Sequence, residues 1–366
     1  MRPAAEACMS HIPGSEISGP DADPIFRVLL DSTPPAVTGD EAQALLALHW
    51  GVEGAAESLP CERDTTFRIR TDGPGYTLKF ANPAEPAAGT NLQTEALLWL
   101  ERQAPDLRAP HVVAARDGRH EVPVTLPDGR TSVARLLSWV EGTPLAHVGA
   151  GPQTAAQIGD LAARLGLALR DFRHEAAAHE ILWDIRHAAR LLPLVEALPD
   201  TPLRERLHAE LDRFETRVLP CLRGLRWQVV HNDMNHHNLL VDPTDPGRVT
   251  GVLDFGDMVK TPLIVDVAVA ASYLIHGAPD PVAPILRMVG AYHRVVPLRR
   301  SELVLLRDLI VARLMTSVVI SRTRARLYPQ NAAYILRNHD AALDGLARFA
   351  ALPPGAVTEA FVHVLR

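Results

Sequence analysis

Alternation of apolar and polar residues marks the first part of the folded chain as β-rich. In residues 65–70 (TTFRIR) and 76–80 (YTLKF), apolar side chains recur at about every second position, and the DGPG between them is a turn sequence. The alternation places Tyr76 and Phe80 on one face and Lys79 on the other. This pattern predicts a β-hairpin.

Two helices and a further strand are expected around this hairpin. The helices cover residues 41–49, with Asp40 as the cap, and residues 90–103, and the strand covers residues 131–140. After a Glu-Gly-Thr-Pro break the pattern becomes mostly helical, apart from one strand-rich patch. We therefore expect an α+β fold with two lobes.

The lobe boundaries follow from this change of pattern. Residues 40–140 form a small β-rich lobe, and residues 141–366 form a larger, mainly helical lobe. Residues 1–39 are dense in Pro, Gly, Ser and Ala and show no periodicity, so we expect a flexible leader.

The most apolar segments do not read as membrane spans. Residues 263–275 contain Asp266, and residues 303–320 contain Arg307, Asp308 and Arg313, each of which is costly in lipid. We expect both segments to be buried helices of a protein without a membrane contact. The N-terminus also lacks the continuous apolar core of a secretory signal.

Composition narrows the class of protein. A net charge of -6 over 366 residues leaves no large excess of Lys and Arg, so binding to nucleic acid is not expected. Cys8, Cys61 and Cys221 are far apart and form no CxxC pair, which favours neither a disulfide framework nor a zinc ribbon. A reducing cytoplasm fits this usage best.

A polar loop lies inside the strand-rich patch. Residues 229–240 read VVHNDMNHHNLL, with a run of polar residues between apolar ones. Apolar residues at 238–242 and 249–254 flank the turn sequence PTDPGR, which predicts a second hairpin. A turn centred near Pro246 would place Asn238 opposite Asp254.

Oxygen ligands converge at the open end of this second hairpin. The amide of Asn238 and the carboxylate of Asp254 suit Mg²⁺, because they leave room for water and phosphate oxygens. Asp233, on the loop, lies within reach of the same place and is positioned to accept a proton from a hydroxyl group.

The order of these residues resembles the catalytic layout of protein kinases. His231, Asp233 and Asn238 form an HxDxxxxN motif, and residues 254–256 form Asp-Phe-Gly. Asn232 stands where glycine is usual, and Asn is the residue that best replaces glycine in a left-handed conformation.

Zinc catalysis is a weaker interpretation of the same loop. The spacing of His231, His236 and His237 matches neither a helical HxxxH face nor a finger pattern, and no cysteine lies nearby. We expect His231 to bond the loop backbone and the other two histidines to line or rim the cleft.

Lys79 is the candidate cation for the phosphates of a nucleotide. Glu95, on the half-apolar face of the following helix, is its expected partner, although both residues could also be solvated surface charges.

The loop that should cover the phosphates contains no glycine. Residues 59–69 (LPCERDTTFRI) nevertheless offer backbone N–H groups and the hydroxyls of Thr65 and Thr66 as donors. In this arrangement Glu62 and Asp64 point away from the phosphates.

Segments along most of the chain resemble the aminoglycoside phosphotransferase family of small-molecule kinases, and within it hydroxylysine kinases. The resemblance runs from Ala44 to Phe349 and is carried by LPCERDTTF, YTLKFAN, ARLLSWVEGTPLA, HNDMNHHNLL, GVLDFGDM and RLYPQNAAY. It implies a protein-kinase-like bilobal fold.

The same resemblance implies roles for individual residues. Asp233 becomes the catalytic base, Asn238 and Asp254 the Mg²⁺ ligands, and Lys79 the phosphate contact. The backbone near the lobe junction is implied to hold the purine, at Trp139, Val140 and Glu141. GTP is implied as the donor, but the residues alone do not separate GTP from ATP.

Charge complementarity suggests the acceptor site. Hydroxylysine carries a carboxylate and two ammonium groups, so Arg313 is the candidate for the carboxylate, and Asp257 and Asp184, beside Trp183, are candidates for the ammonium groups. Each also has a structural interpretation: a cap for Asp257, core packing for Trp183, and for Arg313 a salt bridge with Asp266 or Asp308. Asp266 is expected to brace the catalytic loop, as in relatives.

Two classes of function remain open. The first is a kinase of a small amino alcohol, with 5-hydroxylysine preferred and aminoglycosides, choline, ethanolamine or homoserine as alternatives. The second is a catalytically silent nucleotide-binding protein, which has no chemical need to keep Lys79, Glu95, Asp233, Asn238 and Asp254 together. The oligomeric state is left open by the sequence.

Overall fold

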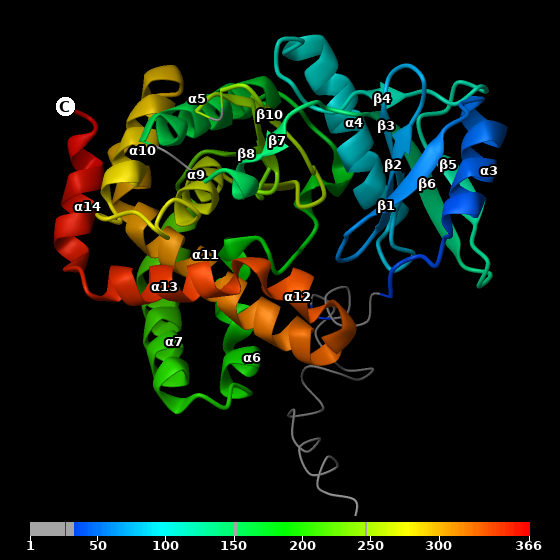
Figure 1. Cartoon of the computed structure of the whole chain (residues 1–366). Coiled ribbons are helices and arrows are strands. Elements are labelled where there is room, and N and C mark those ends of the chain that lie inside the picture. The colour runs from blue at the N-terminus through cyan, green and yellow to red at the C-terminus, as the bar shows by residue number, and fades with distance from the viewer. Residues whose placement is uncertain (1–25, 27–32, 150–151, 246) are drawn as a thin grey trace, which may run out of the picture.

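The computed structural model describes residue 26 and residues 33–149, 152–245 and 247–366, arranged as two lobes (Figure 1). Most of the expected leader lies outside these residues. Its last part is hydrogen-bonded to the small lobe, since the carbonyl oxygen of Thr33 accepts from Asn82 Nδ2 and that of Pro35 accepts from Thr65 Oγ1.

The small lobe is built on an antiparallel sheet of order β1-β2-β3-β6-β4, with β5 paired to β6. Its strands are β1 (Ala55–Leu59), β2 (Thr65–Arg70), β3 (Tyr76–Phe80), β4 (Val112–Val113), β5 (Val122–Thr125) and β6 (Thr131–Ser138). The expected hairpin is β2–β3, in which Thr66 lies opposite Lys79. Phe67, Leu78 and Phe80 are buried in the core of this lobe.

Two helices accompany this sheet, α3 (Gly39–Trp50) and α4 (Ala87–Gln103). The cap of α3 is Thr38 rather than Asp40, because the Thr38 hydroxyl accepts the Glu41 N–H and the Glu41 carboxylate accepts the Thr38 N–H. Helix α4 begins three residues before the predicted start and packs toward the large lobe (Figure 1).

The large lobe is mainly helical. Its helices are α5 (Pro152–Leu169), α6 (Leu192–Glu196), α7 (Thr201–Arg213), α8 (Leu219–Leu222), α9 (Leu263–Ser272), α10 (Ala283–Val295), α11 (Arg300–Leu327), α12 (Ala332–Ile335), α13 (His339–Ala350) and α14 (Pro354–His363). Short 3-10 or π turns are η1 (Leu145–His147), η2 (Glu175–Ala178), η3 (Ile185–Leu191), η4 (Phe214–Val218), η5 (Pro329–Asn331) and η6 (Leu336–Asn338).

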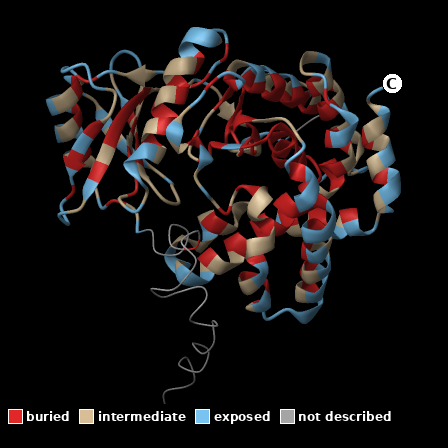
Figure 2. Cartoon of the chain, turned by 180° about the vertical axis from the view of Figure 1, so that it is seen from behind, coloured by how far each residue is buried: buried red, intermediate tan, exposed pale blue. Residues whose placement is uncertain are grey.

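Both apolar segments form buried helices, as predicted. All ten residues of α9 are buried, including Asp266, and most of α11 is buried where the two helices pack (Figure 2). Among the described residues, none of the helices is both long enough and apolar enough to cross a membrane.

Two small sheets carry the polar loop. Their strands are β7 (Thr143–Pro144), β8 (Trp227–Val230), β9 (Leu239–Val241), β10 (Val249–Val252) and β11 (Val259–Pro262), in the orders β10-β9-β7 and β11-β8. The predicted second hairpin is β9–β10.

The register of this hairpin differs from the prediction by one residue. Leu239 lies opposite Val252, and the Leu253 N–H donates to the Asn238 carbonyl oxygen at 2.7 Å, so Asn238 faces Leu253 instead of Asp254. The cause is the turn, since Val249 pairs with Val241 and the turn is therefore centred on residue 245 instead of 246. An irregularity between Val249 and Gly251 then shifts the pairing by one residue toward the predicted register. Asp254 follows immediately and remains next to the loop.

Helices α5 and α10 pack closely, and a glycine permits their approach. A Cβ atom at Gly159 of α5 would overlap the carbonyl oxygen of Met288 in α10. Gly159→Ala should therefore lower the free energy of unfolding by about 3 kcal/mol in denaturant titration. Gly290→Ala is the matched control on α10, since its Cβ meets no atom within 4 Å and it should gain up to about 1 kcal/mol. Equal effects of the two substitutions would contradict this packing.

Candidate active site

A buried carboxylate, that of Asp266, is hydrogen-bonded to the backbone of the catalytic loop. The Asn232 N–H donates to Asp266 Oδ1 at 2.7 Å, and Asn232 has φ 64°, the left-handed conformation that was predicted. Burial raises the pKa of Asp266 to about 6, although the hydrogen bond from Asn232 opposes this shift. Asp266 thus braces the loop as expected.

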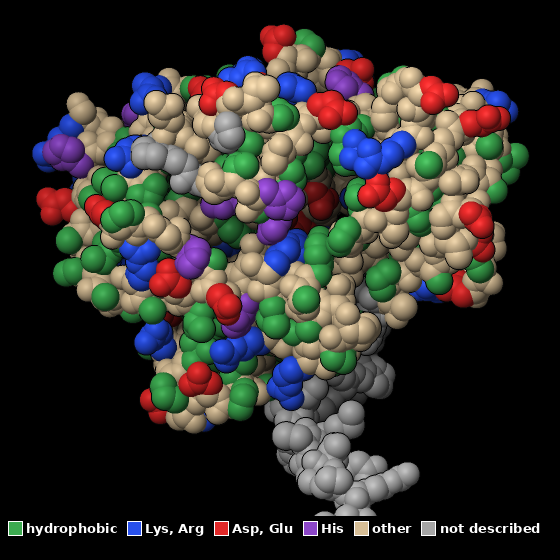
Figure 3. Space-filling view, in the orientation of Figure 1, with side chains coloured by type: hydrophobic (Ala, Val, Ile, Leu, Met, Phe, Trp, Pro, Cys, Tyr) green, Lys and Arg blue, Asp and Glu red, His purple; other side chains and the backbone are tan. Residues whose placement is uncertain are grey.

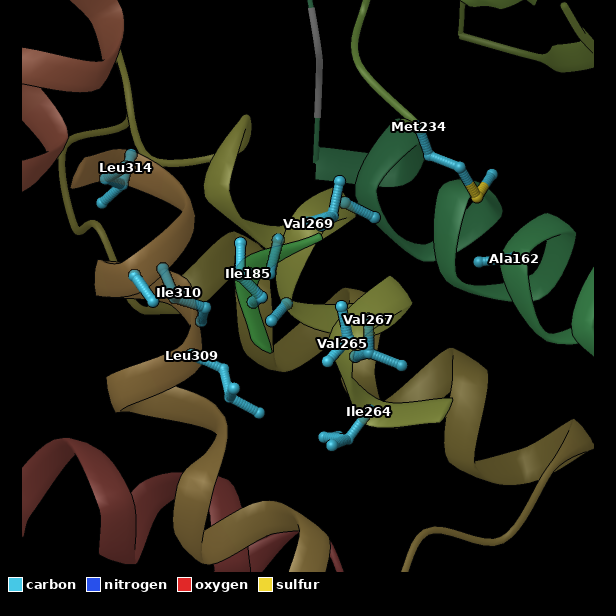
Figure 4. Close-up of a cluster of buried hydrophobic side chains, with 14 of the residues drawn as sticks. Ala162, Ile185, Met234, Ile264, Val265, Val267, Val269, Leu309, Ile310 and Leu314 are labelled. Carbon is cyan, nitrogen blue, oxygen red and sulfur yellow. The ribbon is translucent and has the colours of Figure 1, made fainter. Parts of the chain in front are cut away.

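Two further contacts fix the same loop. His231 Nε2 lies 3.0 Å from the Leu253 carbonyl oxygen, and His231 Nδ1 accepts the Asp233 N–H, which confirms its bond to the backbone. Met234 is fully buried, and its side chain points toward Ala162 of α5 (Figure 4). The loop is therefore anchored at both its polar and its apolar side chains.

Asp233 is held in place by three donors. Its Oδ1 accepts from Arg313 Nη2 at 2.9 Å, and its Oδ2 accepts from Asn238 Nδ2 at 2.8 Å and Asn235 Nδ2 at 2.9 Å. Burial raises the pKa of Asp233 to about 7, against the opposing charge of Arg313. With 18% of the side chain exposed, this carboxyl group can reach a ligand and titrates in the range that suits a general base.

The oxygen atoms near Asp233 fit Mg²⁺. The amide nitrogen of Asn238 is occupied by Asp233, which leaves its Oδ1 as an acceptor. Asp254 has φ 57° and a side chain that is 48% exposed, and the charge of Lys79 lowers the pKa of its carboxyl group to about 2. An amide oxygen and an ionised carboxylate form a donor set that Mg²⁺ accepts.

Lys79 has two carboxylate partners, and Glu95 is not one of them. Its Nζ lies 3.5 Å from Asp254 Oδ1 and 3.5 Å from Asp64 Oδ2, so the predicted pair with Glu95 is wrong. Helix α4 instead turns Gln93 toward the cleft. Because residues two apart lie roughly 200° apart around a helix, Glu95 faces another direction.

A buried arginine occupies the place beside Lys79 where a helix carboxylate was expected. Arg135 lies opposite Lys79 in the β3–β6 ladder and donates to Gln93 Oε1 at 2.8 Å. The inner face of α4 therefore provides neutral acceptors to Arg135, and the carboxylate for Lys79 comes from Asp64.

The loop before β2 also differs from the prediction. Asp64 and Glu62 were expected to point away, but both line the cleft: Asp64 contacts Lys79, and Glu62 forms an ion pair with Arg324. Asp64 is fixed because its Oδ1 accepts the backbone N–H of Asn82 at 3.1 Å.

The two threonines predicted to contact phosphate have other partners. Thr65 Oγ1 donates to the Pro35 carbonyl oxygen at 2.6 Å, and Thr66 Oγ1 donates to the Cys61 sulfur at 3.8 Å. Both hydroxyls thus have protein partners, and that of Thr66 is bonded to the loop that lines the cleft. Contact of Thr65 and Thr66 with phosphate stays a prediction.

Residues 139–141 lie at the lobe junction, directly after β6. The Trp139 N–H donates to the Gly75 carbonyl oxygen at 2.9 Å, and the Glu141 carbonyl oxygen accepts from Arg108. Two of the backbone groups around Val140 thus have protein partners. Purine binding by Trp139, Val140 and Glu141 stays a prediction.

Arg313 is hydrogen-bonded to Asp233 of the catalytic loop. Its guanidinium donates to Asp233, to the Tyr273 hydroxyl at 3.0 Å and to the Trp183 carbonyl oxygen at 3.2 Å, and it lies 4.9 Å from the centre of the Trp183 ring. Its carboxylate partner is Asp233 instead of Asp266 or Asp308. Arg313 thus positions Asp233, and its expected role as the carboxylate receptor stays a prediction.

The two aspartates suggested for ammonium groups have different environments. Asp257 lines the cleft and pairs with Arg63 Nη2 at 2.7 Å. Asp184 is fully buried, caps η3 and accepts from Arg186 and Thr261, and burial raises its pKa to about 6. Asp184 is thus a structural residue and lies outside the cleft.

The cleft side chains that sequence reasoning did not place there include Arg63, Asp64, Tyr273 and Arg337. Only Arg63 and Asp64 left a signal, since they are charged residues in the loop directly before the Lys79 hairpin. His236, expected at the cleft, lines an adjoining hollow beside Tyr273, and burial lowers its pKa to about 4.

A hollow opens between the lobes, and acidic side chains show at its floor (Figure 3). Both lobes contribute to it, with residues 61–64, Lys79, Glu85 and Gln93 on one side and Trp183, Asp233, Asn235, Asp254, residues 256–257, Tyr273, Arg313, Ser317, Ser321, residues 334–335 and 337–339 on the other. A bilobal fold whose cleft brings together Asp233, Asp254 and Lys79, with Asn238 bonded to Asp233, is typical of kinase-like phosphotransferases.

The chain belongs to the phosphotransferase enzyme family, whose model matches residues 61–305. It is therefore an enzyme that transfers phosphoryl groups to an alcohol group. It is 28% identical to the hydroxylysine kinase of Xenopus laevis over 329 residues, covering 84% of this chain and 88% of that protein. The hydroxylysine kinase of Mus musculus is 25% identical over 327 residues, covering 83% and 87%.

Solved structures share the fold at lower identity. An amicoumacin kinase in complex with AMP-PNP and Ca²⁺ has a TM-score of 0.63 at 14% identity, covering 84% of this chain and 94% of that one. A microcompartment-associated aminopropanol kinase has a TM-score of 0.60 at 19% identity, covering 84% and 98%. The predicted protein-kinase-like bilobal fold is confirmed.

The partner of Lys79 can be tested directly. Asp64→Asn keeps the bond to Asn82 but removes one of the two carboxylate charges that share Lys79. Lys79 should then move toward Asp254, and kcat/KM for the nucleotide should fall roughly tenfold. Glu95→Gln is the matched control and should stay within about twofold of wild type. Steady-state kinetics with varied nucleotide make the measurement. The reverse order of effects would restore Glu95 as the partner.

Proposed function

We propose that this chain transfers the γ-phosphoryl group of ATP or GTP to the hydroxyl group of a small amino alcohol, with 5-hydroxylysine as the preferred acceptor. The observation that carries this proposal is the placement of Asp233, partly exposed in a cleft and held by Arg313 and Asn238. The names of the curated relatives at 28% and 25% identity support the acceptor.

Each residue of the cleft has a part in this reaction. Asp233 accepts the proton of the acceptor hydroxyl, and its fixed carboxylate orients that hydroxyl toward the phosphorus atom. Lys79 contacts the phosphates, and Asn238 and Asp254 hold Mg²⁺. The ion, when bound, neutralises negative charge on the transferred group.

The charges of the cleft favour an acceptor with an amine. Six carboxylates and four Lys or Arg side chains line it, so the cleft carries a negative excess before nucleotide binds. Asp257 follows the Asp-Phe-Gly segment and lines the cleft, and it is proposed to take an ammonium group, with Trp183 beside the acceptor. Aminoglycosides, choline, ethanolamine and homoserine are the alternative acceptors.

A catalytically silent nucleotide-binding protein is the second candidate. It would not require a base whose pKa is raised to about 7 by burial, as that of Asp233 is. The proposed ATP or GTP donor, Mg²⁺ and a cytoplasmic location are parts of the same proposal.

Replacing the base should abolish turnover and spare nucleotide binding. Asp233→Asn should lower kcat by at least about 10²-fold, because the amide cannot accept the proton, while the Kd for nucleotide changes little. The measurement is radiolabel transfer from ATP and from GTP to a panel of hydroxylysine, simple amino alcohols and aminoglycosides.

Asp160→Asn, at an exposed site on α5, is the matched control and should behave as wild type. Transfer by wild type to none of these acceptors, with nucleotide still bound, would favour the silent protein. Near-normal turnover of Asp233→Asn would remove Asp233 from its role.

A further inference from the structure

Ion pairing in the cleft is complete except at one residue. Each lining carboxylate has a cationic partner: Glu62 with Arg324, Asp64 and Asp254 with Lys79, Glu85 and Asp257 with Arg63, and Asp233 with Arg313. Arg337 is the remaining cation. Within the part of the chain that the structure describes, no carboxylate lies within ion-pair distance of it.

Arg337 is nevertheless fixed in place. It lies on η6, its Nη1 donates to the Tyr334 carbonyl oxygen at 3.1 Å, and its guanidinium stacks over the Tyr334 ring at 3.8 Å from the centroid. Its Nε is buried without a hydrogen-bond partner among the described residues. A positive group that is held and partly dehydrated, with donors left over, is poorly compensated by the protein alone.

From these contacts we infer that Arg337 is the receptor for a carboxylate group on the phosphoryl acceptor. A planar guanidinium binds a carboxylate through two parallel hydrogen bonds, and the stacking on Tyr334 preorganises that fork. The acceptor class is thereby a hydroxylated amino acid rather than a simple amino alcohol. The inference rests on the proposed function and specifies its substrate.

The position of Arg337 also separates this group from the nucleotide. Lys79 and Arg63 provide the cations on the small-lobe side, whereas Arg337 comes from the segment between α12 and α13 of the large lobe. Tyr273 also lines the cleft and accepts from Arg313, and the charges of Asp233 and Arg337 act on its pKa in opposite directions. In this placement the acceptor has its hydroxyl at Asp233 and its carboxylate at Arg337, two residues that line the same cleft.

Arg313, the earlier candidate for this role, is excluded by its own contacts. It already neutralises Asp233, so a second carboxylate there would compete with the base. Arg337 has no carboxylate partner among the described residues, so an anion that binds to it breaks no ion pair of the protein.

The test compares acceptors with and without the carboxylate. Arg337→Met should raise KM for 5-hydroxylysine by about 10- to 100-fold, while KM for the decarboxylated diamine, KM for nucleotide and kcat change less than about twofold. Arg337→Lys keeps the charge but loses the fork and should lie between the two. Arg326→Met, which removes an exposed arginine at the end of α11, is the matched control and should match wild type.

The outcomes separate this inference from the proposed function. Equal changes for both acceptors, or no change, would overturn the role of Arg337 and leave the kinase intact. If wild type phosphorylates neither acceptor, the proposed function fails. The inference is then tested by calorimetry, which measures the affinity of wild type and Arg337→Met for lysine and for cadaverine, two ligands that lack the hydroxyl. Selective loss of lysine affinity in Arg337→Met supports it, and any other binding result overturns it.

Discussion

The carboxylate of Asp233 is the point where three parts of the large lobe meet. It accepts from Arg313 on α11, from Asn238 at the start of the β9–β10 hairpin, and from Asn235 on its own loop. Burial alone would keep this group protonated, and the guanidinium opposes that tendency. The proposed chemistry depends on this balance, because a base must be dehydrated enough to bind a proton near neutral pH and still ionise.

The rest of the cleft follows the same logic of paired charges. Asp64 and Asp254 share Lys79, and Asp257 and Glu85 share Arg63, so each of these carboxylates has a cationic partner within the protein. A phosphate group that binds Lys79 competes with its two carboxylate partners. The carboxylate partners of Lys79 and Arg63 therefore influence the affinity for nucleotide. A cation without a carboxylate partner in the described part of the chain, Arg337, is free to bind an anionic group of a ligand.

The sequence predicted what depends on local pattern and motif. The β2–β3 hairpin, the left-handed Asn232 and the brace from Asp266 follow from alternation, backbone preference and resemblance. It failed at Glu95, because α4 turns Gln93 toward the cleft instead and Lys79 pairs with Asp64. It failed by one residue at Asn238, because the turn of the β9–β10 hairpin is centred one residue earlier than predicted. No signal in the sequence pointed to Arg337, because the lack of a carboxylate partner among the described residues depends on contacts that only the folded chain makes.

The pH dependence of kcat/KM for the acceptor tests the balance at Asp233 most directly. Protonation of the base removes activity, so the rate should fall tenfold per unit below a pKa near 7 and level off above it. Arg313→Gln removes the charge that lowers this pKa, so the acidic limb of its pH profile should move to higher pH. Arg313→Lys keeps the charge, so its acidic limb should stay near that of wild type. A limb that stays in place in Arg313→Gln, or a rate independent of pH down to pH 5, would contradict the account.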